Sequence, residues 1–201
     1  FHWIQDMSAY LKCIEKNCNK TIPSTSKVYV CPSCEGLLDV AYHFEISDPE
    51  KTKQIFHQRR SSNNLLDLSG VWRYRELLPF CTDFSKVVSI QEGNTPIYNA
   101  PQCAEYVGLK KLNLKHQGLN PTGSFKDNGM TTGVTQANLV GSKIVACAST
   151  GNTSASMAAY AARAGIRAVI FIPDQQIGFG KLAQSLDYGA TTIQLEGNFD
   201  E

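Results

Sequence analysis

A lysine in residues 118–130 is placed where structure alone would not favour one. The segment reads GLNPTGSFKDNGM, and after two turn dipeptides Ser124 can cap a helix whose first turn contains Lys126. A cation in that turn meets the positive end of the helix dipole, which costs from a few tenths to ~1 kcal/mol. The same field favours the neutral amine, the form that attacks an aldehyde carbonyl. Lys126 is therefore the candidate nucleophile.

A second loop has the pattern of an anion site. Residues 146–155 read ACASTGNTSA and join an apolar, strand-like run to an alanine-rich helical run. Such a junction directs several backbone N–H groups at one point, and the hydroxyl groups add further donors. The loop has one glycine, whereas nucleotide-phosphate loops need Gly-Lys-Ser/Thr or three spaced glycines. ATP and NAD are therefore poor candidates for its ligand.

Four of the seven cysteines form two pairs. Cys13-x4-Cys18 and Cys31-x2-Cys34 are separated by twelve residues, which is within the spacing of a zinc ribbon. A zinc ion held by four thiolates has no open position, so this metal would be structural. The alternative is a degenerate zinc knuckle with reduced, unligated thiols. The other three cysteines lie alone, which fits reduced thiols better than a disulfide framework.

The elements that must position these groups alternate between strand and helix. We expect strands at 111–116, 143–148, 168–172 and 190–195, and helices at 125–139, 154–164 and 178–188. This order predicts βαβ units, an α/β fold of three αβα layers and a mostly parallel sheet. Before them we expect a zinc-ribbon-like β module at 1–44, with strand-like runs at 27–30 and 37–42. A linker follows at 45–69, with room for a short helix, and its polar part at 45–64 should form no core. Residues 70–201 form the catalytic region.

Composition excludes several classes of function. The 201 residues carry 19 Lys and Arg against 18 Asp and Glu, with no basic cluster, so we expect no nucleic-acid partner. No apolar stretch approaches the ~18 residues of a membrane span, and the first residues lack a signal core. We therefore expect a cytoplasmic protein with no membrane partner. Both ends look cut, and we expect a fragment that is incomplete at its C-terminus.

Three segments now identify a family. NPTGSFKD at 120–127, ASTGNT at 148–153 and EGNTP at 92–96 resemble segments of the fold-type-II pyridoxal-phosphate enzymes. Further segments are most similar to the threonine synthases: GVWRYREL at 70–77, AAYAARAG at 158–165, KLAQ at 181–184 and EGNFD at 196–200. The resemblance covers nearly the whole chain and implies a tryptophan-synthase-β-like fold.

The resemblance assigns a role to each matched residue. Lys126 would hold pyridoxal phosphate through its amine and move protons among the substrate carbons. Phe125 would pack behind the cofactor, and Asn152 would donate a hydrogen bond to its phenolic oxygen. The substrate carboxylate would be held by Ser149, Thr150, Gly151 and Thr153. Lys181 would face the substrate phosphate, with an exposed helix lysine as the alternative, just as Asn152 could be a mere helix N-cap.

The implied reaction converts O-phospho-L-homoserine and water to L-threonine and phosphate, the work of a carbon–oxygen lyase acting on phosphates. Relatives are often homodimers, so we expect a homodimer of the full-length protein. Two departures stand out. Asn128 replaces an arginine of many relatives, and relatives continue for about another domain that carries the glycine-rich loop for the cofactor phosphate and the partner of the pyridine nitrogen. We therefore expect the chain alone to bind the cofactor poorly and to be inactive.

Two other functions remain open from the sequence. Another fold-type-II enzyme, such as a threonine or serine dehydratase or a cysteate synthase, would share the lysine and asparagine motifs. A non-enzymatic scaffold with a zinc-ribbon interaction module would share only the overall architecture.

Overall fold

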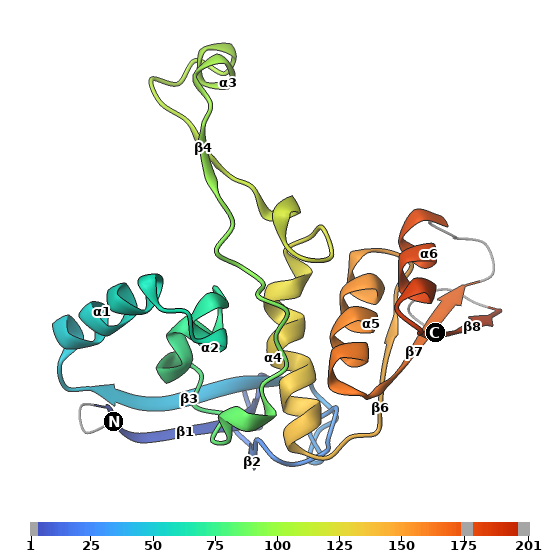
Figure 1. Ribbon diagram of the computed structural model, residues 1–201. Coiled ribbons are helices and arrows are strands. Elements are labelled where there is room, and N and C mark those ends of the chain that lie inside the picture. Colours follow the sequence, from blue (N-terminus) through green and yellow to red (C-terminus); the bar gives the residue numbers. More distant parts are fainter. Residues whose placement is uncertain (1–3, 174–178, 197–201) are drawn as a thin grey trace.

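The chain folds into a thin N-terminal β module, a projecting arm and a helix-covered parallel sheet (Figure 1). The structure, a computed structural model, describes residues 4–173 and 179–196, and the side chains of all these residues except 4–7, 44, 179 and 181. Within these ranges no helix combines the length and the apolar character needed to cross a bilayer.

The N-terminal module is a three-stranded antiparallel sheet. Its central strand β1 (Ile4–Cys13) pairs with β2 (Thr21–Pro23) on one side and β3 (Leu38–Ile46) on the other. The strand expected at 37–42 is thus confirmed within β3. The strand expected at 27–30 is wrong, because this run pairs with no strand and Tyr29 is 93% exposed, so alternation there does not mark a buried face.

The segment expected as a linker is more ordered than its sequence predicts. It forms α1 (Pro49–Gln58), η1 (Arg59–Ser61) and α2 (Leu65–Leu68), and η2 (Trp72–Leu77) follows. Arg59 is buried in a bidentate pair with Glu76, and Arg75 donates to buried Asp67 at 2.6 Å. Thr52 and Arg59 are buried, so the expectation that residues 45–64 contribute no core is wrong. Their buried contacts are polar, so they leave no apolar periodicity in the sequence.

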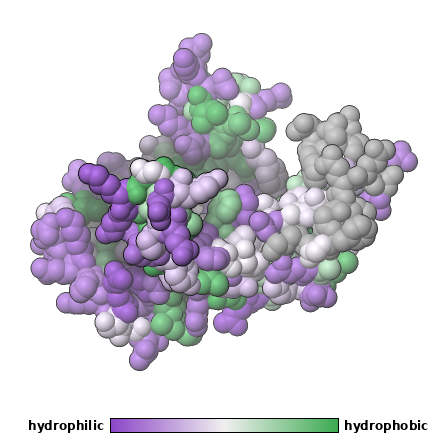
Figure 2. All heavy atoms as spheres, turned by 90° about the horizontal axis from the view of Figure 1, so that it is seen from above, coloured by the Kyte–Doolittle hydropathy of each residue, from purple (hydrophilic) through white to green (hydrophobic). Residues whose placement is uncertain are grey.

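An arm projects from the body of the molecule (Figure 1). After η3 (Phe84–Lys86), strands β4 (Ile97–Asn99) and β5 (Asn113–Lys115) form an antiparallel pair with α3 (Pro101–Tyr106) at the tip, and η4 (Gln117–Leu119) leads back. The strand expected at 111–116 exists but joins this hairpin, not a parallel sheet. Seen from above, the visible face of the molecule carries hydrophobic residues interspersed among hydrophilic ones (Figure 2).

The C-terminal part contains the predicted βαβ units. Strands β6 (Ile144–Ala148), β7 (Arg167–Pro173) and β8 (Thr191–Leu195) are parallel in the order β6-β7-β8. They alternate with α5 (Asn152–Ala164) and α6 (Phe179–Asp187), and α4 (Lys126–Leu139) packs against α5. Gly165 ends α5 in the left-handed conformation at φ 67°, as a glycine at a helix C-terminus should. The helices and strands expected in this region are confirmed to within two residues at each end.

The parallel sheet buries one face only. Ala168, Ile170 and Ile172 of β7 pack against Met157, Ala158 and Ala161 of α5. On the opposite face Ile144, Ile193 and Leu195 are exposed, so the described residues show helices over a single face. Two of the three sheets are antiparallel. The described chain is therefore a mixed α/β structure, in which the three layers and the mostly parallel sheet are not seen.

Candidate functional site

Lys126 is the first residue of α4, as the dipole argument requires. Its backbone N–H donates to Ser124 Oγ at 3.3 Å, so the serine serves the helix start although Phe125 is the formal N-cap. Lys126 is half-buried, and its Nζ lies 4.8 Å from the centroid of the Phe125 ring. That ring is 56% exposed, which leaves it free to cover a planar ligand.

Asp127 is a buried carboxylate directly after the lysine. It accepts hydrogen bonds from Thr122 N–H at 2.7 Å, from Thr122 Oγ1 at 2.5 Å and from Ser156 Oγ at 2.5 Å. Thr122 begins the loop that leads to Lys126, and Ser156 lies on α5. The Asp127 side chain thus closes the loop of residues 122–126, here called the lysine loop, and links it to α5. The sequence reasoning missed this residue, because nothing local shows that the carboxylate points inward.

The predicted anion loop joins β6 to the N-terminus of α5. Ser149 Oγ accepts from Gly151 N–H at 3.2 Å, and Ser154 Oγ donates to the Gly151 carbonyl at 2.8 Å. Gly151 is the N-cap, and no side chain caps the helix. The reading of Asn152 as the N-cap is therefore wrong: it is the first helical residue, and its side chain is exposed. Thr150 and Thr153 are half-buried beside it.

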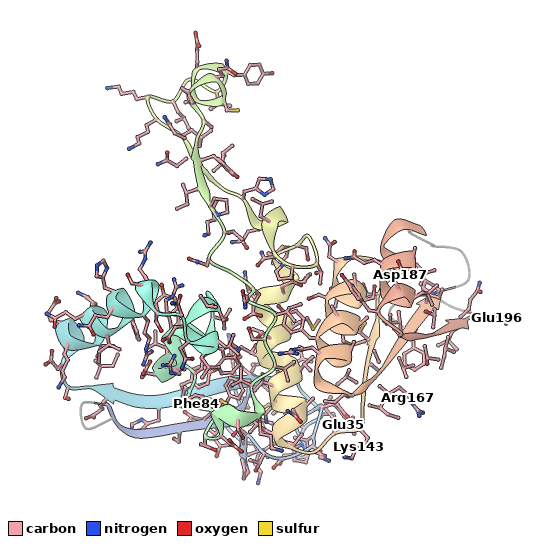
Figure 3. The ribbon with its side chains drawn as sticks, in the orientation of Figure 1. Glu35, Phe84, Lys143, Arg167, Asp187 and Glu196 are labelled. Atoms are coloured by element: carbon pink, nitrogen blue, oxygen red, sulfur yellow. The ribbon has the colours of Figure 1, made fainter. Side chains whose placement is uncertain are left out.

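The two loops lie at the same end of the molecule. α4 and α5 lie side by side with both N-terminal ends toward the top of the view (Figure 1). The third helix contributes as well, since Gln184 Nε2 of α6 donates to the Thr122 carbonyl at 3.3 Å. Lys181 belongs to the first turns of α6, but its side chain lies outside the described residues. Lys143 and Arg167 lie at the opposite end of the parallel sheet, away from these two loops (Figure 3).

A second buried carboxylate supports α5 one turn further along. Glu92 accepts from Tyr160 Oη at 2.8 Å and from Ile90 N–H at 3.2 Å, and the hydroxyls of Ser69 and Ser89 also donate to it. Burial, followed by the charge of Glu92, raises the pKa of Tyr160 far above its ordinary value of 10.0. The EGNTP segment at 92–96 therefore contains an anchor for α5.

Asn128 lies next to the loop that Glu92 holds. Its Nδ2 donates to Gln117 Oε1 at 3.2 Å, and its buried Oδ1 has no hydrogen-bond partner among the described residues. A Cβ built on Gly93 would lie 3.3 Å from that oxygen. Asn128 therefore fills a tight site against the EGNTP loop.

The four paired cysteines come together. The sulfurs of Cys13, Cys18, Cys31 and Cys34 all lie within 4.8 Å of one another, with Cys13–Cys34 at 3.5 Å and Cys18–Cys31 at 3.6 Å. The residue after each pair has a positive φ, with Asn19 at 49° and Glu35 at 60°, so the chain turns sharply after the second cysteine of the pair.

Backbone N–H groups act on these thiols. A hydrogen bond from Ser33 outweighs burial and lowers the pKa of Cys31 to about 7. For Cys34, the hydrogen bond from Gly36 lowers the pKa, but the neighbouring Cys18 and Cys13 thiols outweigh it and raise the pKa to about 12. The thiols are close enough to determine one another's charge.

Comparisons with known proteins identify the family of the chain. Residues 88–201 match the family described as "Pyridoxal-phosphate dependent enzyme". The chain is 45% identical over 190 residues to the threonine synthase of Methanocaldococcus jannaschii, covering 94% of this chain and 44% of that protein. Against the threonine synthase of Methanosarcina acetivorans it is 45% identical over 194 residues, with coverage of 96% and 44%.

Among solved structures, maize serine racemase aligns with a TM-score of 0.49 and 28% identity, over 54% of this chain and 33% of that one. The chain spans less than half the length of the two threonine synthases that match nearly all of it. The family match covers more than half of the chain, including α4, α5 and α6, where the candidate lysine and both loops lie. The chain belongs to the pyridoxal-phosphate dependent enzymes.

Proposed function

We propose that the protein containing this chain is a threonine synthase, which converts O-phospho-L-homoserine and water to L-threonine and phosphate with pyridoxal phosphate as cofactor. One observation carries the proposal. Lys126 and Asn152 are the first residues of two adjacent helices whose N-terminal ends lie at the same end of the molecule. The chain that carries them is similar to a threonine synthase over 94% of its length.

The residues at this end suit the cofactor. The Lys126 amine is the group that an aldehyde requires, and the exposed Asn152 amide can donate to a phenolic oxygen. The exposed Phe125 ring offers an apolar surface on which a planar ring can pack. When bound, pyridoxal phosphate supplies an electron sink that stabilises carbanions.

The chain's own groups then bind the substrate and move its protons. Lys126, which would hold the cofactor, would also act as general base and general acid at successive substrate carbons. Ser149, Thr150, Gly151 and Thr153 hold the substrate carboxylate with hydroxyl and backbone N–H groups at the start of α5. Lys181 faces the substrate phosphate, which leaves from the γ carbon while the oxygen of water adds at the β carbon.

The rest of the longer protein completes the architecture in this proposal. It adds the second helical layer over the open face of the β6-β7-β8 sheet, and with further parallel strands it gives the three-layer fold. It also supplies the site for the cofactor phosphate. We propose that the protein works as a homodimer in the cytoplasm.

The test is made on the full-length protein. Borohydride reduction with cofactor should attach it to Lys126, as read by peptide mass spectrometry. Lys126→Ala should lower phosphate and threonine formation by about 10²-fold or more, since it removes both the attachment point and the acid–base group. Lys143→Arg, at the far end of the sheet, is the matched control and should retain activity.

The product distinguishes the alternatives. Ammonia and a keto acid from threonine or serine, without phosphate release, would show a dehydratase. A cysteate product from the same phosphorylated class of substrate would show a cysteate synthase. Absence of label on Lys126 in the wild-type protein would show a non-enzymatic scaffold.

We propose in addition that Cys13, Cys18, Cys31 and Cys34 bind a structural zinc ion. A tetrahedron with Zn–S bonds of about 2.3 Å has edges of about 3.8 Å, and the four sulfurs lie within 4.8 Å of one another. The module buries few large apolar side chains, with Tyr29 and Leu37 exposed, so metal binding would supply its folding free energy.

Metal analysis with thiol titration tests the zinc site. We expect one zinc per chain and four thiols that react only after chelation, whereas Cys103, which is exposed, reacts at once. Cys34→Ser should release the metal, and Cys103→Ser is its control. Four freely reactive thiols in a metal-free folded protein would show a degenerate knuckle.

A further inference from the structure

We infer that the hydrogen bond between Asp127 and Ser156 sets the position of Lys126 relative to Asn152, which makes Asp127 and Ser156 positioning residues of the cofactor site. This inference rests on the function proposed above. It concerns the bond from Ser156 Oγ to Asp127 Oδ1 at 2.5 Å, which joins α5 to α4.

The spacing along α5 makes this bond specific to the site. Asn152, Ser156 and Tyr160 are four residues apart and share one face of the helix. Each step along that face is about 6 Å, so Asn152 lies one turn above the bond. On the other helix the bonded carboxylate is adjacent in sequence to Lys126. A single hydrogen bond therefore separates the backbone of the lysine from the helix of the asparagine.

The same carboxylate also holds the loop before the lysine. Thr122 donates to it twice, from its N–H at 2.7 Å and from Oγ1 at 2.5 Å, which closes the turn through Ser124 and Phe125. Asp127 is fully buried, and no cation pairs with it among the described side chains. Its hydrogen bonds must therefore compensate its desolvation, and bonds to a charged group are the stronger kind.

The structure contains a matched control on the same helix face. Tyr160 Oη donates to the buried carboxylate of Glu92 at 2.8 Å, one turn beyond Ser156. This bond also ties α5 to a neighbouring segment through a fully buried acid. Glu92 bonds to neither Asp127 nor Thr122, so loss of the Tyr160 bond should cost stability while the Asp127–Ser156 bond beside Lys126 remains.

The experiment compares Ser156→Ala and Tyr160→Phe in the full-length holoenzyme. Both should lower the melting temperature. Only S156A should shift the pH midpoint of the cofactor's visible absorption band and reduce the fraction of Lys126 that borohydride labels at limiting cofactor. It should also lower kcat by about tenfold or more with little change in KM, because a misplacement of about 1 Å costs up to about 10²-fold in rate.

Two further variants keep the test decisive. Ser156→Thr restores the hydroxyl and should recover the wild-type absorption midpoint. Asp127→Asn keeps the volume but loses one acceptor oxygen, and should shift the midpoint in the same direction as S156A. Equal spectra and equal kcat for S156A and Y160F, with wild-type Lys126 labelled, overturn this inference alone. An unlabelled wild-type Lys126 overturns the proposed function and this inference with it.

Discussion

At the scale of single residues, buried polar groups connect the parts of this chain. Asp127 joins the lysine loop to α5, and Glu92 joins the EGNTP loop to the same helix. Each carboxylate gathers donors from segments that are distant in sequence. Replacing an acceptor that bonds several buried donors at once should be strongly destabilising, because its loss leaves those donors buried and unpaired.

Gly70 offers a direct test of close backbone approach. A Cβ on this residue would lie 2.2 Å from the Asn94 backbone nitrogen and 2.7 Å from the Gly93 carbonyl carbon. Gly70→Ala should therefore lower the free energy of unfolding by about 1–3 kcal/mol, as overpacking does. Denaturant unfolding of the purified protein measures the change.

Gly129→Ala is the control for that substitution. Gly129 lies inside α4, and a Cβ there meets nothing within 4 Å. Alanine should raise the free energy of unfolding by up to about 1 kcal/mol through helix propensity. If G70A were as stable as G129A, the predicted clash between residue 70 and the backbone of Gly93 and Asn94 would be wrong.

The sequence could predict Lys126 but not the groups that fix it. Its position conflicts with the helix dipole, and that conflict is visible from neighbouring residues alone. Asp127 makes no such conflict, since an acid in a first turn is ordinary. Its partner Ser156 is 29 residues away, and only the packing of α4 on α5 brings the two together.

At the scale of elements, periodic apolar segments were predictable and polar ones were not. Helix α5 and strand β7 follow their expected ranges because they bury apolar side chains against each other. Helix α4 buries Asp127, Thr131 and Thr135 beside Val134, so its range was predictable from its start signals and not from an apolar face. The segment that contains α1 and α2 packs through ion pairs that extend to η2, and without an apolar pattern its sequence resembled that of a linker. Strand β5 was found, but its antiparallel partner β4 is three residues long and gives little signal.

Glu76 should be the most sensitive residue of the ion-pair segment. Its carboxylate binds buried Arg59 with two hydrogen bonds, and Arg59 also donates to the Arg73 carbonyl at 2.6 Å. Glu76→Ala removes the bidentate partner of that buried guanidinium and leaves it Asp67, whose Oδ1 lies 3.6 Å from Nε, so it should cost up to about 3–5 kcal/mol of unfolding free energy. Thermal or denaturant unfolding measures it.

An exposed ion pair provides the comparison. Glu50 pairs with Lys53 at 2.8 Å on the surface of α1. Glu50→Ala should change stability by no more than about 0.5 kcal/mol. Similar losses for E50A and E76A would mean that the ion pairs around Arg59 are solvated in solution.

At the scale of the whole molecule, the arm is the least supported part. Its two strands pair only with each other, and Ile97, Tyr106 and Leu114 are exposed. A lone hairpin is marginally stable in water at best. Limited proteolysis of the isolated 201 residues should therefore cut within 97–119 before it cuts α4 or α5. Fragments mapped by mass spectrometry would contradict this if the first cuts lay in the helices.

The isolated chain should also bind the cofactor weakly. It holds the lysine and asparagine of the site, whereas the expected phosphate loop lies in the longer protein. Titration of the purified 201 residues with pyridoxal phosphate should give no strong visible band under conditions that saturate the full-length protein. A strong band would show that the lysine loop and the loop before α5 suffice to bind the cofactor.

The open face of the parallel sheet has a consequence for biosynthesis. Ile144, Ile193 and Leu195 are exposed on it, while α5 and α6 cover the other side. In a longer protein these strands leave the ribosome before any later segment can cover them, at about 5–20 residues per second. For that interval the nascent chain exposes apolar side chains on this face, and we expect chaperones that shield unfinished translation products to bind it.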